Sequence, residues 1–180
     1  MSGASEGRSG SAVKAPGRRE GRTRRGWRLW GRKDRGGSDA VPTGVAASMV
    51  TSGGLLLAMV EDLRMRGDSG PEDVRPLADT FARHLAAKEA TVRKVLERRG
   101  ESVELVRRDR QEGELIQGIL DRTLIGRHPE DTRLLTIDGA LAQMYQYLFH
   151  ERRDLVPALE RAVPEDESRT LASAFEEANR

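Results

Sequence analysis

The sequence has 180 residues, which is enough for one domain of ordinary size with an additional tail. It contains no cysteine, which excludes disulfides, thiolate catalysis and cysteine-ligated zinc sites. The net charge of +2 conceals an asymmetry, because residues 1–48 carry 11 Lys and Arg against 4 Asp and Glu, whereas residues 49–180 carry 20 against 25. The basic character therefore belongs to the N-terminal segment.

The composition favours helices and a soluble protein. Aromatic residues make up only 4% of the chain, while Leu, Ala, Arg and Glu are abundant. The longest apolar stretch, residues 53–60, is too short to cross a bilayer, and the N-terminus lacks an apolar signal core. We therefore expect a cytoplasmic protein with no membrane span.

Residues 1–45 are rich in Gly, Ser and Arg and are predicted to form a disordered basic tail. Basic and aromatic side chains alternate within it, as in segments that contact nucleic acid or an anionic membrane surface. The candidate nucleic-acid contacts are Arg24, Arg25, Trp27, Arg28, Trp30, Arg32 and Lys33. Two plainer interpretations are favoured, since such tails are common: a solvated tail, or sequence upstream of a genuine start at Met49.

From Met49 onward the apolar residues follow helical spacing, with no sustained alternation that would indicate strands. Gly67 and Gly70-Pro71 mark the end of one helix and the start of the next. The expected helices cover residues 49–66, 71–99, 101–124 and 132–161, followed by a short one after residue 164. Four amphipathic helices with short connections predict an all-α fold, an up-down antiparallel four-helix bundle over residues 46–180 with a short C-terminal helix.

Two of these helices carry polar pairs with i, i+4 spacing, which places both side chains on one helix face. The pairs are His84/Lys88 and Tyr147/Glu151. His150 and Asp154 form a further pair, but helical geometry places His150 away from the inward face, so it is predicted to lie at the surface. Because no glycine-rich phosphate loop or anchored Ser-His-Asp arrangement occurs, the chain is not expected to be an enzyme.

The run from Phe81 to Glu89 and the run from Tyr147 to Leu159 resemble the two halves of a hemerythrin-like domain of the HHE cation-binding family, over about residues 49–178. That resemblance implies a di-iron cage of about five histidines and two bridging carboxylates. Lys88 replaces a bridging carboxylate and Tyr147 a histidine, while Gly113, and Ser52 or Gly53, stand where further histidines are needed. The chain has three histidines in all, namely His84, His128 and His150.

Two arrangements of the remaining residues stay open. His84 and Glu151, with Asp109 as a third donor, offer a reduced site for iron or another divalent metal. Alternatively, Lys88 and Glu151 form a buried ion pair without metal, and the Tyr147 hydroxyl bonds a carboxylate or His84. The second is favoured because an ammonium repels a divalent cation.

The leading hypothesis for function is a hemerythrin-like bundle that has lost the usual di-iron and oxygen binding. It would act as a non-enzymatic regulatory or interaction module with no cofactor, with a protein partner that the sequence does not identify and an oligomeric state it does not predict. One alternative is a variant metal-binding protein for sensing or storage. Another is a bundle tethered to nucleic acid through the basic tail.

Overall fold

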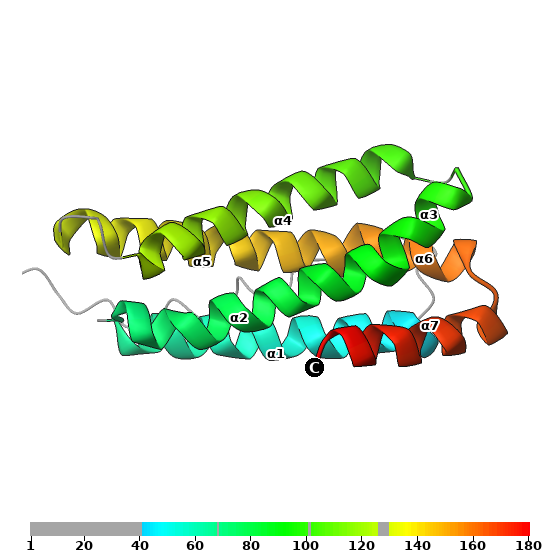
Figure 1. The fold of residues 1–180 in the computed structure, drawn as a ribbon, viewed down its shortest axis with the longest axis horizontal. Helices are drawn as coiled ribbons and strands as arrows, with labels where there is room; N and C mark the ends of the chain where they lie inside the picture. The colour runs from blue at the N-terminus through cyan, green and yellow to red at the C-terminus, as the bar shows by residue number, and fades with distance from the viewer. Residues whose placement is uncertain (1–40, 68, 101, 126–129) are drawn as a thin grey trace, which may run out of the picture. The chain divides into compact units, whose positions relative to one another are not determined.

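Four long helical columns follow one another in the computed structural model, which describes residues 41–67, 69–100, 102–125 and 130–180 (Figure 1). The first and third columns are single helices, α1 (Gly44–Arg66) and α4 (Val103–Leu124). The second and fourth are each interrupted by a π-helix: α2 (Pro71–Lys88), η1 (Glu89–Arg93) and α3 (Lys94–Arg98), then α5 (Glu130–His150), η2 (Glu151–Leu155) and α6 (Val156–Ala162). A last helix, α7 (Glu165–Ala178), ends the chain. The prediction of an all-α protein is confirmed for these residues.

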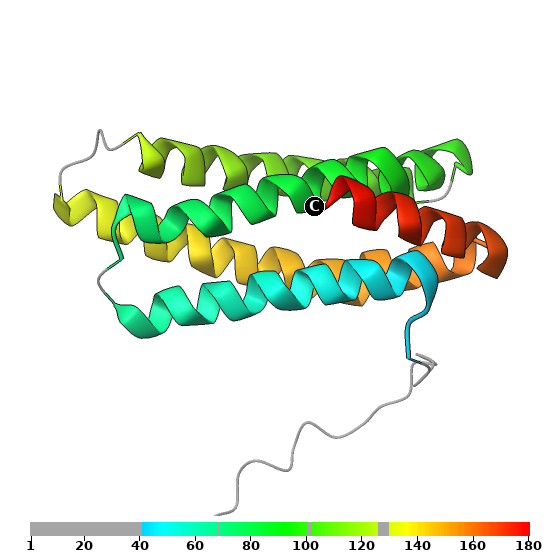
Figure 2. The same cartoon turned by 60° about the horizontal axis from the view of Figure 1, so that its bottom comes forward.

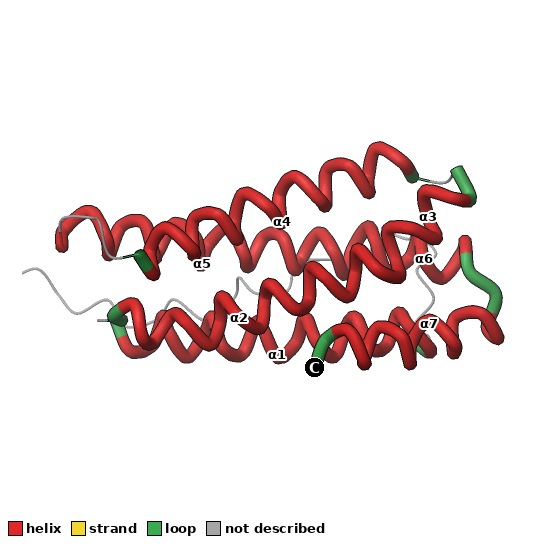
Figure 3. The backbone as a smooth tube through the Cα atoms, in the orientation of Figure 1, coloured by secondary structure: helices red, strands yellow, loops and turns green. Residues whose placement is uncertain are grey.

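Successive columns run in opposite directions and are joined by short connections (Figures 2 and 3). Helix α4 packs against α2 and α5, and α1 packs against α2 and α5. Helix α7 turns back after α6 and lies along α1, with which it makes its most extensive contact.

The turn between α1 and α2 has the chemistry that the sequence indicates. Gly67 ends α1 in the left-handed conformation, with φ 72°, which glycine adopts at little cost. Pro71 occupies the first helical position of α2, and the Asp73 carboxylate accepts the Gly70 N–H at 2.9 Å.

The buried apolar residues form two clusters. One contains Leu56 of α1, Phe81 of α2, Leu120 of α4 and Met144 of α5. The other contains Met49 of α1, Leu96 of α3, Val106 of α4 and Leu159 of α6, together with Phe175 of α7. In every column one buried polar residue lies in sequence between the two clusters, namely Ser52, His84, Asp109 and Glu151. Lys88, one turn after His84, is buried as well.

The start of the first helix differs from the prediction. Helix α1 begins at Gly44 rather than near Met49, and Val45, Ala46 and Met49 are all buried. The residues from Gly44 to Ser48 thus belong to the same compact unit as the other described helices. The predicted disordered tail, residues 1–45, therefore extends too far, because Gly44 and Val45 are helical. Its residues 1–40, with the candidate contacts from Arg24 to Lys33, lie outside the described residues.

Helix α1 also corrects the expectation that no segment is long and apolar enough to cross a membrane. Its 23 residues meet that requirement by length and composition, because an 18-residue window within them has a mean hydropathy of 1.5. Core helices of soluble proteins meet the same requirement, and α1 contributes eight buried residues to this fold. The helix is therefore weak evidence for a membrane span.

Candidate functional site

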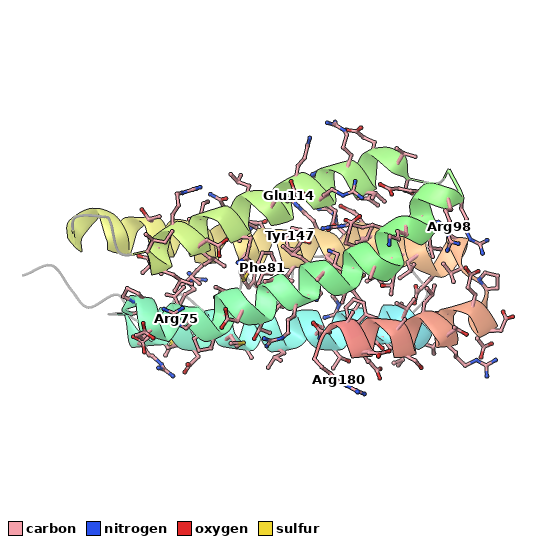
Figure 4. All side chains as sticks on the ribbon, in the orientation of Figure 1. Arg75, Phe81, Arg98, Glu114, Tyr147 and Arg180 are labelled. Atoms are coloured by element: carbon pink, nitrogen blue, oxygen red, sulfur yellow. The ribbon has the colours of Figure 1, made fainter. Side chains whose placement is uncertain are left out.

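The Lys88 side chain is fully buried and lies among three oxygen atoms from two other columns. Its Nζ donates hydrogen bonds to Asp109 Oδ1 at 2.6 Å, to Glu151 Oε2 at 2.6 Å and to the Tyr147 hydroxyl at 2.7 Å. An ammonium group has three N–H donors, so each donor has a partner. Figure 4 shows Tyr147 and Phe81 between the columns; their rings meet edge to face at 5.5 Å.

His84 extends this network toward α1. Its Nε2 lies 2.9 Å from Glu151 Oε2, and its Nδ1 lies 2.9 Å from Ser52 Oγ. A neutral imidazole satisfies both contacts if Nε2–H donates to Glu151 and Nδ1 accepts from the Ser52 hydroxyl, an assignment made from the network. Ser52 Oγ in turn accepts a hydrogen bond from Asn179 Nδ2 at 3.1 Å, next to the C-terminus.

Arg93 extends the network on the other side, toward α4. Its Nε and one terminal nitrogen lie 2.8 and 2.7 Å from Asp109 Oδ2, and its other terminal nitrogen donates to Glu89 Oε2 at 3.2 Å. The sequence analysis missed Arg93, since in an α-helix a residue five positions after Lys88 lies roughly 140° around the axis. The π-helix η1 brings both side chains to Asp109. We call these seven residues the Lys88 cluster: Ser52, His84, Lys88, Arg93, Asp109, Tyr147 and Glu151.

The charges of the Lys88 cluster balance, because Lys88 and Arg93 face the carboxylates of Asp109 and Glu151. Burial alone would raise the pKa of Glu151, but Lys88 and His84 outweigh that effect and lower it to about 2. Burial alone would lower the pKa of Lys88, but Glu151, Tyr147 and Asp109 outweigh burial and raise it. Burial raises the pKa of Tyr147, so its hydroxyl stays protonated near neutral pH.

Two glycines leave the space that this packing needs. A Cβ atom on Gly113 would lie 2.7 Å from Leu85 Cδ2 and 3.3 Å from the Tyr147 hydroxyl. A Cβ atom on Gly53 would lie 3.2 Å from Glu151 Oε1. At both positions, where the resemblance required histidines, neighbouring side chains already fill the space.

Of the three predicted metal ligands, Asp109 and Glu151 bind the Lys88 ammonium, and His84 bonds the same Glu151 oxygen as Lys88. The ammonium therefore occupies the position between the two carboxylates where a metal ion would have to bind. Within the described ranges, no group of three or more His, Asp or Glu side chains has the geometry of a metal site. One imidazole and two carboxylates bound to Lys88 and Arg93 do not fit a di-iron centre.

The structure also refines the predicted partners. Lys88 and Glu151 pair as expected, but the Tyr147 hydroxyl bonds Lys88 rather than a carboxylate or His84. His150 is half-buried at the surface and lies 3.1 Å from an Arg108 nitrogen and 3.7 Å from Glu112. Asp154 pairs with Arg153 instead of His150. His128 lies outside the described residues.

One hollow reaches the Lys88 cluster from between α4 and η2. It has a volume of about 10 Å³ and is lined on its inner side by Asp109, Tyr147 and Glu151. That volume has room for about one water molecule and is too small for an organic substrate. A larger apolar groove of about 350 Å³ lies between α4 and α5, around Leu115 and Ala142.

Comparisons of the chain with protein-family models, with curated proteins and with solved structures gave no match. Interpretation of the site therefore depends on the residues and the geometry described above.

Proposed function

We propose that this chain is an up-down four-helix bundle of the hemerythrin-like type in which the Lys88 ammonium takes the place of a bound cation. In this proposal the protein works as a non-enzymatic regulatory or interaction module. The observation that supports it is the position of Lys88 Nζ, which lies within hydrogen-bond distance of Asp109, Tyr147 and Glu151.

Electrostatics supports an internal cation over a metal ion. A divalent ion at the carboxylates would lie next to the charges of Lys88 and Arg93, whose repulsion is strong where burial reduces screening. The Lys88 ammonium, by contrast, is covalently attached to α2, so the site does not have to take up a cation from solution. Its desolvation is offset by two carboxylates and a hydroxyl, and every N–H of the group has an acceptor.

A structural role for the cluster is supported by the lack of room for a substrate. The charged groups of the Lys88 cluster bond one another, and the hollow beside them holds about one water molecule. A general acid, base or nucleophile must lie within reach of the atoms on which it acts. We therefore infer that the Lys88 cluster makes the packing of the helices specific. The module would contact its partner through its outer surfaces.

Metal analysis and thermal unfolding of the purified full chain test the proposal that no metal ion is bound. The proposal expects substoichiometric iron, manganese and zinc, and a melting temperature that added iron(II), manganese(II) or zinc(II) leaves unchanged. A metal that binds only the folded state would raise the melting temperature by mass action. Stoichiometric iron with an oxo-bridge absorption band would overturn the proposal.

The His84→Ala variant separates the proposal from the metal-binding alternative. If a metal raises the melting temperature of the unchanged protein but not that of His84→Ala, the variant metal-binding alternative replaces the proposal. If added metal leaves the melting temperature of each protein unchanged, the metal-binding alternative fails.

A further inference from the structure

Helix α1 is apolar on its outer side as well as on the side that faces the core. No charged residue occurs from Gly44 to Val60. A helix at the surface normally carries charged side chains on the face turned away from the core, whereas a helix that is apolar all round is covered on every side. Only 39% of the most apolar window of α1 is buried in this fold. Much of its apolar surface is therefore left uncovered.

Helix α7 covers one side of α1 and leaves another side open. It packs on α1, α2 and η1, so it lies on the side of α1 next to α2. On its other side α1 contacts α5, where a Cβ atom on Gly53 would lie 3.7 Å from Leu148 Cδ2. The residues that follow these two, Gly54 and Phe149, are both exposed, and a Cβ atom on Gly54 would meet nothing within 4 Å. The outer surface along α1 and α5 is therefore open.

We call this surface the α1–α5 face. Its residues, all exposed, include Gly54, Ala58, Asp138, Tyr145, Phe149 and Arg152. Two aromatic residues one turn apart, Tyr145 and Phe149, are 42% and 51% exposed. Single exposed apolar residues are ordinary, but aromatic rings beside an uncovered apolar helix are typical of an interaction surface.

The charges on the α5 side of this face have a symmetric order. Asp138, Tyr145 and Arg152 follow one another at i, i+7 and i+14, which places them along one stripe, since Arg152 is only the second residue of η2. Asp138 and Arg152 thus lie about 10 Å along the axis to either side of Tyr145. Neither forms an ion pair within the part of the chain that the structure describes. Opposite charges at equal distances from a central ring make the stripe complementary to itself.

We propose that the α1–α5 face binds the same face of a second copy of this chain, in a dimer whose two-fold axis passes by Tyr145. The two α5 helices would lie antiparallel, so that Asp138 of each chain faces the partner's Arg152. The two Tyr145 rings would meet at the axis. Gly54 and Ala58 have small or no side chains, so the two copies of α1 can approach closely.

The charges favour a second copy over the other occupants of an apolar face. A lipid surface would leave Asp138 and Arg152 without partners next to hydrocarbon, which is costly. A second copy supplies the opposite charge at both positions by symmetry, whereas an unrelated protein would need that order independently. The inference goes beyond the proposed function, because it requires nothing of the Lys88 cluster or of metal binding, and either can fail without the other.

Charge reversal in the full chain tests this pairing. Asp138→Arg places like charges opposite each other at both ends of the interface, and Arg152→Asp does the same. Each variant alone should raise the dissociation constant of the dimer at least about tenfold in sedimentation equilibrium. An equimolar mixture of the two variants should form a heterodimer within about threefold of the original affinity, because every facing pair again has opposite signs.

Glu114→Arg is the matched control. Glu114 is exposed on α4, outside the α1–α5 face, and its reversal changes the net charge as much as Asp138→Arg does (Figure 4). This control should leave the dissociation constant unchanged, and circular dichroism verifies that each variant is helical. Tyr145→Cys provides a measurement without charge reversal, since the natural sequence has no cysteine. On oxidation it should link two copies in much higher yield than Glu114→Cys.

Four results would overturn the proposal. The first is an unchanged protein that stays monomeric at every concentration, including one that binds anionic lipid vesicles as a monomer. The second is a mixture of the two reversal variants that associates no better than either variant alone. The third is a Glu114→Arg variant that dimerises as weakly as Asp138→Arg, and the fourth is a disulfide yield for Tyr145→Cys no higher than that of Glu114→Cys.

Discussion

Replacing Lys88 by methionine removes the buried ammonium while keeping a side chain of similar length. Lys88 Nζ is the only cation within hydrogen-bond distance of Glu151 among the described contacts, whereas Asp109 retains Arg93. The variant therefore leaves one buried carboxylate with His84 as its sole charged or hydrogen-bonding neighbour from the cluster. The charge of the cluster changes from balanced to one net negative.

We expect Lys88→Met to lower the free energy of unfolding by about 3–5 kcal/mol, the cost of breaking a buried pair by removing one partner. Changing Glu151 to methionine as well removes the unpaired carboxylate and restores the charge balance. The double variant should then lose clearly less than the sum of the two single losses, with a coupling of about 2 kcal/mol or more.

Urea unfolding followed by circular dichroism at pH 7 measures all four members of this cycle. Lys94→Met is the matched control, because Lys94 is exposed on α3 and should stay within about 0.5 kcal/mol of the unchanged protein. A loss below about 1 kcal/mol for Lys88→Met, or single losses that simply add, would refute the tethered-cation interpretation.

Three further measurements address other parts of the chain. In the folded protein the pKa of Glu151 is about 2, compared with an ordinary value of 4.5. The ionised carboxylate therefore stabilises the fold above pH 4.5 by on the order of 3 kcal/mol, and this contribution disappears as the pH falls toward 2. The free energy of unfolding of Glu151→Gln should accordingly depend less on pH over this range. The Cβ atom of Gly54→Ala would meet open space, so this variant should raise the free energy of unfolding, measured with urea, by about 0.5–1 kcal/mol. Gly113→Ala should not raise it, because its Cβ would lie 2.7 Å from Leu85 Cδ2. An equal gain for both variants would contradict the packing described around Gly113. If the basic tail contacts nucleic acid, single-strand affinity should fall steeply with salt and Trp27→Ala should cost about 1–3 kcal/mol; binding that is insensitive to salt removes that alternative.

The helical spacing of the apolar residues indicates most of the core, although Met59 and Leu105, which follow the same spacing, are only partly buried. Leu56, Leu77, Phe81, Leu120 and Met144 all lie in the core, because a stripe repeating every three or four residues has to face the other helices. The start of α1 was placed too late, since Gly44 to Ser48 consists of small residues whose burial depends on α7. A contact between residues more than 120 positions apart leaves no mark on local periodicity.

The site was predictable only in part. Spacing alone places His84 with Lys88 on one helix face and Tyr147 with Glu151 on another. That the two faces meet was implied by the family resemblance, and the structure brings Glu151 to both His84 and Lys88. Arg93 could not be predicted, because it reaches Asp109 only through the wider turn of η1.

Both π-helices adjoin the Lys88 cluster, and this suggests why two otherwise regular columns are interrupted. Helix η1 begins directly after Lys88 and ends at Arg93, and η2 begins with Glu151. A π-turn is less favourable than an α-turn, so it persists where other contacts offset its cost. In η1 the wider turn brings Arg93 to Asp109, the carboxylate that already accepts from Lys88, so each of the two carboxylates has a cation. A strictly α-helical second column would turn Arg93 away and leave two buried carboxylates to share one ammonium. The charge balance of the interior thus depends on the backbone of η1 as much as on the side chains.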